Sequence, residues 1–228
     1  MLGQKKKFSR KEMKEDTLVT FYYKAIEYFE EYKKYVFIGV GAIAVIILAF
    51  FLYSESKSSN NEKANVELSR VIPLYEQGAY LEAIEGKPGT QLVGLKKIVE
   101  EYGNSDMGEV AKIYLANSYY NLGKFDEAMK FYDDFGGDNE TFQATAFAGI
   151  AACYEAKNNI EDAVDYYRKA ASVSKENVLN PQYLLSASIN LITLNKKEEA
   201  RELLKQIKKD FTNSPYTREI DRYLAITE

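Results

Sequence analysis

One uninterrupted apolar segment, residues 36–53, constrains this chain more than any other feature. It contains no charged residue and no proline. As an α-helix rising about 1.5 Å per residue it would be about 27 Å long, close to the hydrocarbon thickness of a bilayer. A buried helix of a soluble protein would normally carry some polar face. The segment therefore predicts a single transmembrane helix, followed by a long polar region.

The charges on either side of this segment predict its orientation. Residues 1–34 hold nine Lys or Arg and six Asp or Glu, and Lys33 and Lys34 adjoin the apolar segment. Only Lys57 and Lys63 follow closely behind it. Because basic flanks resist translocation, we expect the N-terminus in the cytoplasm and the C-terminal region outside. In a bacterium with two membranes, this places the C-terminal region in the periplasm.

A cleaved signal peptide is the alternative interpretation of the same segment. Ser54 and Ser56 are small residues of the kind found at cleavage sites. However, the apolar core of a signal peptide is only about 7–15 residues long, and here a segment of 35 residues precedes it. We therefore expect the helix to be retained as an anchor.

Residues 17–35 form a second helical pattern directly before the apolar segment. Apolar side chains recur there every three or four residues, and charged side chains occupy other positions. Two interpretations stay open: an amphipathic helix at the membrane interface, or a cytoplasmic extension of the transmembrane helix. Four tyrosines flank or end the apolar segment and fit the aromatic belts found at the two membrane–water boundaries: Tyr28, Tyr32, Tyr35 and Tyr53.

Small residues lie near one face of the expected transmembrane helix, at Gly39, Ala42 and Ala49. Small residues allow another membrane helix to approach closely. They are tentative candidates for a contact within the membrane.

The composition excludes several kinds of activity. The sequence has no histidine, so a Ser-His-Asp triad and His-containing zinc sites cannot form. No phosphate-binding glycine motif is present. Cys153 is the single cysteine and is expected to be a buried apolar side chain in a helix. We predict no catalytic site, metal or cofactor, and the acidic balance beyond the N-terminus argues against nucleic acid as a partner.

A cluster of acidic and amide residues, Asp138, Asn139 and Glu140, invites comparison with a calcium site. Its spacing does not fit the EF-hand loop. We expect this cluster to cap the following helix instead.

A short helix–helix turn recurs along the C-terminal region. Its copies are separated by about 35 residues, and the first interval is longer because of an insertion at residues 86–89. A period near 35 with two helices per unit predicts a helical solenoid. The copies are Gly78–Ala83, Gly123–Ala128, Asn158–Ala163 and Asn195–Ala200.

This repeat resembles the tetratricopeptide repeat. Leu115, Ala116 and Tyr119 fit the first half of its signature, and Ala128 with Tyr132 fits the second half. Tryptophan is absent, and the usual closing proline is missing from the middle copies. Small residues should allow the paired helices to approach closely; they are Ala116, Ala151 and Ser188 on the first helices, and Ala128, Ala163 and Ala200 on the second.

The whole arrangement resembles the YfgM-like ancillary subunits of the bacterial Sec translocon, of the type found in Bacteroidota. The segments that carry this resemblance are Leu95–Tyr102, Tyr120–Ala128 and Arg218–Leu224. The resemblance implies a position in the inner membrane beside SecYEG, with a PpiD-like periplasmic chaperone as partner.

We therefore expect an all-α chain, with one transmembrane helix followed by a tetratricopeptide-repeat solenoid. The expected parts are a basic cytoplasmic tail (1–16), a juxtamembrane amphipathic helix (17–35), the transmembrane helix (36–53), a polar linker (54–61) and the repeat domain (62–228).

The repeat register also predicts which residues face a partner. A carboxylate-binding clamp is disfavoured, because Ile113, Ala148 and Leu185 stand where polar or basic groups would be needed. We expect instead an apolar groove for a helix or an unfolded segment, unless these residues pack against a neighbouring helix of the same chain. The candidate face comprises Ile113, Asn117, Tyr120, Asn121, Ala148, Ala152, Glu155, Leu185, Ile189 and Ile192.

Two functions follow as hypotheses. The first is a non-enzymatic, membrane-anchored adaptor of the protein-export machinery that binds a chaperone or emerging polypeptides. The alternative is a scaffold for envelope assembly or cell division that is unrelated to export.

Overall fold

The computed structural model describes the backbone of residues 10–228 and the side chains from Val19 onward. Residues 1–9, which include much of the predicted basic tail, lie outside the described residues. The chain divides into two compact units, residues 1–56 and residues 57–228, and each is considered by itself.

Helix α1 (Arg10–Glu76) supplies the first unit and continues into the second. By length and composition, it is the one helix in the described part of the chain that could cross a membrane. None of its most apolar window is buried in the protein. Large side chains such as Ile46 and Phe50, 67% and 72% exposed, therefore have no protein core around them.

The predicted polar linker, residues 54–61, is helical and forms part of α1. The boundary between the two units falls inside it, after Ser56. The segment contains only Ser, Glu, Lys and Asn, and it lacks the glycine or proline that would stop a helix. Pro73 also lies within α1, close to its end, and does not terminate it.

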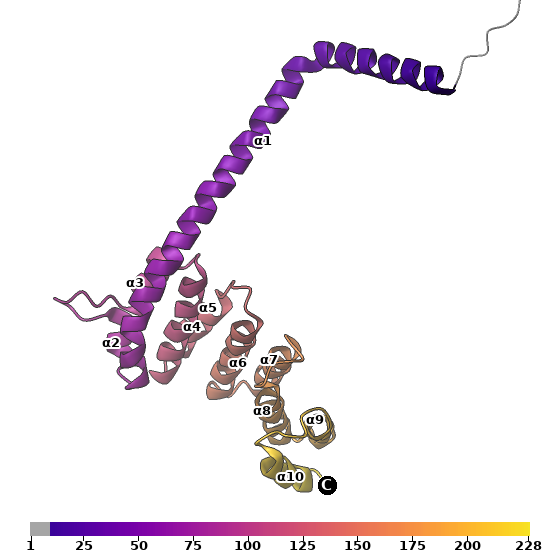
Figure 1. Ribbon diagram of the computed structural model, residues 1–228. Helices are drawn as coiled ribbons and strands as arrows, with labels where there is room; N and C mark the ends of the chain where they lie inside the picture. The colour runs from indigo at the N-terminus through magenta and orange to yellow at the C-terminus, as the bar shows by residue number, and fades with distance from the viewer. Residues whose placement is uncertain (1–9) are drawn as a thin grey trace, which may run out of the picture. The chain divides into compact units, whose positions relative to one another are not determined.

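The second unit is built from helical hairpins, which Figure 1 shows side by side. Helices α4 and α5, α6 and α7, and α8 and α9 form pairs, and each pair packs on the next. In the described residues the only β interaction is an isolated bridge between Gly86 and Val93. The helices after α1 are α2 (Tyr80–Glu85), α3 (Leu95–Tyr102), α4 (Asp106–Asn121), α5 (Phe125–Asp133), α6 (Glu140–Ala156), α7 (Ile160–Ser172), α8 (Asn180–Thr193), α9 (Lys197–Asp210) and α10 (Thr217–Ile226).

The predicted repeat turns share one backbone geometry. Each has a residue with positive φ at the same place: Gly78, Gly123, Asn158 and Asn195, at 77°, 73°, 61° and 60°. The next N–H then donates to the carbonyl five residues earlier, at 2.8–2.9 Å in every copy. This is the Schellman ending of a helix, which favours Gly and then Asn because other residues are strained there.

Two helices, α4 and α6, begin with a residue whose side chain caps the helix. The Ser105 hydroxyl accepts a hydrogen bond from the Gly108 N–H at the start of α4. The Asn139 side chain accepts from the N–H groups of Thr141 and Phe142 at the start of α6. The capping role predicted for Asn139 is therefore confirmed, and it satisfies N–H groups that have no partner within the helix.

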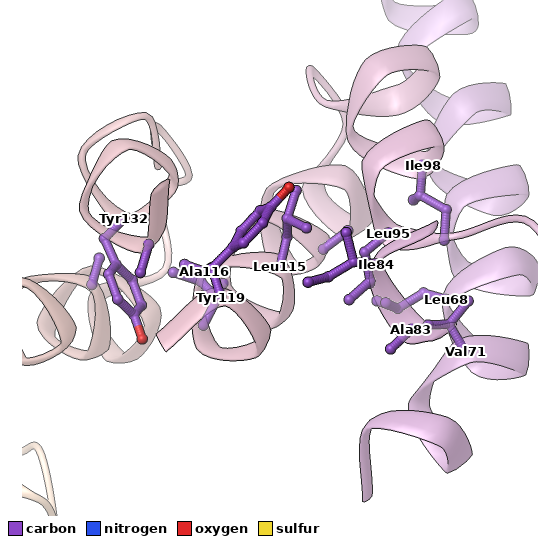
Figure 2. Packing of buried hydrophobic residues seen from close by; sticks show 14 of the residues in the cluster. Leu68, Val71, Ala83, Ile84, Leu95, Ile98, Leu115, Ala116, Tyr119 and Tyr132 are labelled. Atoms are coloured by element: carbon purple, nitrogen blue, oxygen red, sulfur yellow. The ribbon is translucent and has the colours of Figure 1, made fainter. Parts of the chain in front are cut away.

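The core lies between the paired helices. Figure 2 shows Leu68 and Val71 of α1 packed toward Ile84, Leu95 and residues of the following helices. Complete burial of a side chain such as Leu or Ile stabilises the fold by about 1.5–3 kcal/mol. The small residues predicted to permit close helix contact are all fully buried: Ala116, Ala128, Ala151, Ala163, Ser188 and Ala200.

Candidate functional site

A groove of about 310 Å³ runs across the first helices of the last three pairs. Helices α4, α6 and α8 supply most of its lining, and α5 and α7 each add a tyrosine. Its lining contains no charged residue. The residues are Asn117, Tyr132, Thr145, Ala148, Gly149, Ala152, Tyr167, Leu179, Gln182, Tyr183 and Ser186.

Small residues of α6 form part of the groove: Ala148, Gly149 and Ala152. Gly149 is required by the close approach of Tyr132. A Cβ placed on Gly149 would lie 2.2 Å from the Tyr132 Cζ, well inside contact distance. The missing side chain of Gly149 therefore makes room for the Tyr132 ring, which lines the groove.

Phenol groups supply the polar part of the groove. The Tyr132 hydroxyl donates a hydrogen bond to Asn117 Oδ1 at 2.5 Å. The Tyr167 hydroxyl donates a hydrogen bond to Glu155 Oε2 at 3.0 Å. The exposed Glu155 carboxylate therefore lies at the edge of the groove. Tyr183 lies beside Thr145 on the neighbouring helix. These side chains hold each other in place and leave further amide and hydroxyl groups, on Gln182 and Ser186, facing the groove.

The tyrosines in the groove stay neutral at physiological pH. Burial is the main cause that raises the pKa of Tyr132, Tyr167 and Tyr183 above the usual phenol value. A neutral phenol can donate and accept hydrogen bonds, whereas a phenolate cannot donate. The groove thus offers neutral hydrogen-bonding groups beside small apolar ones, which suits an uncharged stretch of polypeptide. Without Lys or Arg, this lining offers no cation to pair with a carboxylate.

Some of the predicted partner-facing residues come together here. Asn117, Ala148 and Ala152 line the groove, and Glu155 lies at its edge. Tyr120 is half-buried and packs against Phe125, with ring centroids 5.6 Å apart. Asn121 is exposed, and its side-chain amide donates to the Asn117 carbonyl at 2.8 Å.

Two other predicted residues lie in the core, which corrects part of the expected face. Ile113 and Leu185 are only 2% and 4% exposed. Ile189 packs against the cluster that joins α8 to α9 and α10, and Ile192 packs against the cluster around Leu191. Ile113 and Leu185 are therefore covered by neighbouring helices of the same chain, whereas Ile189 and Ile192 are half-buried.

Sequence reasoning missed the residues of α8 that do line the groove. Gln182, Tyr183 and Ser186 take the places expected for the apolar residues of this helix. A signal was present, because Gln182 and Ser186 are polar, four residues apart and therefore on one face of the helix.

A larger cavity, about 650 Å³, lies between α7, α8 and α9. Ala171, Leu184 and Leu203 form apolar parts of its wall. Its lining also carries charged residues, Arg168, Lys175 and Asp210, and Arg168 is paired with Glu199 at 3.0 Å. We prefer the smaller groove as the candidate site, because several neutral polar groups converge there.

The remaining candidates carry no assembled chemistry. Among the described residues, no group of three or more Cys, Asp or Glu side chains is placed to hold a metal ion. Cys153 is fully buried, and desolvation raises its pKa to about 12, so the thiol is not a nucleophile at neutral pH. A contact of Gly39, Ala42 and Ala49 with another membrane helix stays a prediction.

Stacked helical hairpins with a common turn define this domain as a helical-repeat solenoid. Comparison with protein families identifies the type of repeat: residues 111–138 match the tetratricopeptide repeat. The match covers most of α4 and all of α5, the pair on which the predicted signature is clearest. A search of curated proteins finds no match. A repeat of this type indicates a protein–protein interaction domain.

Proposed function

We propose that this protein is a non-enzymatic adaptor, anchored in a membrane by residues 36–53, whose repeat domain binds a polypeptide in the groove across α4, α6 and α8. The uncharged groove lined by phenols and small residues carries this proposal. The length and apolar composition of α1 support the anchor.

The chemistry of the groove supports a segment with few charges as its occupant. Neutral phenol, amide and hydroxyl groups can bond to the main-chain groups of an extended segment or to the polar edge of a helix. Small residues such as Ala148 and Ala152 leave room for apolar side chains of the partner. A charged segment would lose hydration without gaining an ion pair.

The location proposed for the adaptor is the protein-export machinery of a bacterial inner membrane. The basic N-terminal flank supports a cytoplasmic N-terminus, and the repeat domain is then periplasmic. The resemblance to YfgM-like subunits supports SecYEG as the membrane partner, with a PpiD-like chaperone or an emerging polypeptide in the groove.

The groove can be tested by placing a charge in it. Gln182 is exposed and lines the groove, so Gln182→Arg should leave the fold intact and weaken polypeptide binding. Gln143→Arg on α6 is the matched control, because Gln143 is also exposed but does not line the groove. Cross-linking and affinity purification from native membranes would measure the partners recovered with each variant.

We expect the unchanged protein and Gln143→Arg to recover translocon subunits with a PpiD-like chaperone, and Gln182→Arg to lose the chaperone. Recovery of neither translocon nor chaperone would remove the export role. Recovery of cell-wall or outer-membrane assembly factors instead would favour an envelope scaffold. Equal recovery with both variants would show that the groove is not the binding site.

Topology has an independent test. Ser58 is exposed near the start of the second unit, and Ser58→Cys in a Cys153→Ala background provides one reactive thiol. We expect an impermeant thiol reagent to label this cysteine in intact spheroplasts. Labelling only after lysis would reverse the proposed orientation.

A further inference from the structure

An aromatic face distinguishes the part of α1 that precedes the apolar segment. At about 100° per residue, six of the seven aromatic side chains between Val19 and Tyr35 gather in a sector of about 140°, and Tyr23 lies outside it. All six are exposed, from 37% at Tyr32 and 44% at Phe29 to 72% at Phe21. The aromatic face comprises Phe21, Tyr22, Tyr28, Phe29, Tyr32 and Tyr35.

A polar face occupies a separate sector of about 120° on the same helix. Lys33, Ile26 and Val19 separate the faces on one side, and Lys24 adjoins Tyr35 on the other. Tyr23 is the one aromatic residue within the polar sector. Segregation of this kind is typical of helices that lie between an apolar and an aqueous phase. The polar face comprises Thr20, Lys24, Glu27, Glu30, Glu31 and Lys34.

We infer that the aromatic face of residues 19–35 binds the lipid–water boundary of the same membrane that residues 36–53 cross. The inference rests on the proposed membrane anchor. No part of the first unit covers the aromatic face, and an exposed patch of this kind calls for an apolar partner.

Continuity with the apolar segment makes lipid the occupant. The rings of Phe29 and Phe37 lie 6.2 Å apart, so the aromatic face reaches the first turn of the proposed span without a break. The rings of Tyr28 and Tyr32 contact each other along the same face, tilted by 34° with their centroids 4.6 Å apart. Tyrosine, with an apolar ring and a polar hydroxyl, is enriched where membrane meets water.

Charge argues for apolar contact with lipid rather than for attraction to an anionic surface. Residues 19–35 contain Lys24, Lys33 and Lys34 against Glu27, Glu30 and Glu31, and Lys33 pairs with Glu30 at 3.0 Å. A balanced segment gains little from anionic headgroups. Binding should therefore persist in zwitterionic lipid and at high salt.

The absence of tryptophan from the chain permits a direct test. Phe29→Trp places a probe on the aromatic face, and Glu27→Trp, about 160° away around the helix, is the matched control. Leu48→Trp reports whether the span itself is inserted. The full-length variants are reconstituted in phosphatidylcholine vesicles that contain a lipid with a fluorescence quencher near its headgroup.

We expect the emission of Phe29→Trp to shift to the blue and to lose intensity to the quencher, while Glu27→Trp resembles a water-exposed residue. If Leu48→Trp inserts but both juxtamembrane probes stay in water, the helix is a cytoplasmic extension and the inference fails alone. Equal quenching of both probes also overturns it, because the helix would then have no lipid-facing side. An uninserted Leu48→Trp would remove the membrane anchor as well.

Discussion

Tyr132 lies directly over Gly149, so that the ring of one residue fills the space in which the other would carry a side chain. This contact joins α5 to α6 and fixes the phenol that bonds to Asn117. It thereby couples the stability of two successive repeats to the shape of the groove between them. A small residue at this position is a requirement of packing and of the proposed binding site alike.

Gly149→Ala should destabilise the repeat domain. Alanine favours the helical state by about 1 kcal/mol, but overpacking costs about 1–3 kcal/mol. We expect overpacking to dominate, because Tyr132 is buried and held by its hydrogen bond. Urea unfolding of the full-length protein in detergent, followed by circular dichroism, would measure the change in midpoint.

Gly136→Ala is the control for this substitution. A Cβ on Gly136 would lie 3.7 Å from Glu109 Oε1, an ordinary contact. Its effect should stay within about 0.5 kcal/mol. Equal midpoints for the two variants would contradict the packing role of Gly149.

Lys112→Met should also destabilise the domain, by about 2 kcal/mol. Lys112 is only 7% exposed, and its ammonium group contacts Glu109 at 2.9 Å and Asp134 at 3.1 Å. Its loss leaves the largely buried Glu109 carboxylate without a cation, which is costly. The effect is moderated because Asp134 is well exposed. Lys96→Met, which breaks an exposed pair with Glu85, should change the free energy of unfolding by less than about 1 kcal/mol.

The contribution of Lys112 to the free energy of unfolding should decrease at alkaline pH. Desolvation lowers its pKa, but hydrogen bonds to Glu109 and Asp134 outweigh it and raise the pKa above the usual 10.5. A raised lysine pKa stabilises the fold below the unfolded value and loses that effect as pH rises through the folded value. The stability difference between the unchanged protein and Lys112→Met should be constant near neutral pH and decrease above about 10.5. A difference that grows in alkali would contradict this assignment.

The repeat turns show how much of the fold is readable from sequence. Gly78, Gly123, Asn158 and Asn195 were identifiable because a left-handed residue at a helix end restricts the amino acid type. The buried alanines, such as Ala128, were identifiable because close helix contact requires small side chains. Both are local constraints that act on a single position.

The groove on α8 could not be predicted in the same way. Leu185 is buried, and Ile189 half-buried, against a cluster shared with α9 and α10, and repeat spacing alone does not report this packing. The polar linker was equally ambiguous, because residues 54–61 have neither a strong helix pattern nor a helix breaker. Where contacts with other helices decide which face of a helix is exposed, sequence periodicity predicts the helix but not that face.

Alkaline pH should destabilise the domain through its buried acids. Desolvation raises the pKa of Cys153 to about 12 and raises those of Tyr132 and Tyr167. The unfolded thiol ionises near its usual value of 9.0, whereas the folded thiol keeps its proton. Stability should therefore fall as pH rises from about 9 to about 12. Unfolding midpoints across this range, compared with those of Cys153→Ala, would isolate the contribution of the thiol. We expect stability to decline less steeply with pH in the variant.

The turn between α6 and α7 provides a pair of substitutions with opposite expectations. Asn158 has φ of 61°, and its N–H donates to the Glu155 carbonyl. Asn158→Ala keeps the backbone bonds but places an ordinary residue in the left-handed region, which costs about 1 kcal/mol. Asn158→Gly removes that strain and should leave stability equal or slightly higher, as Gly123 does naturally in the preceding turn. Thermal unfolding of both variants would measure this difference, and an alanine variant as stable as the glycine variant would show that the Schellman turn does not hold in solution.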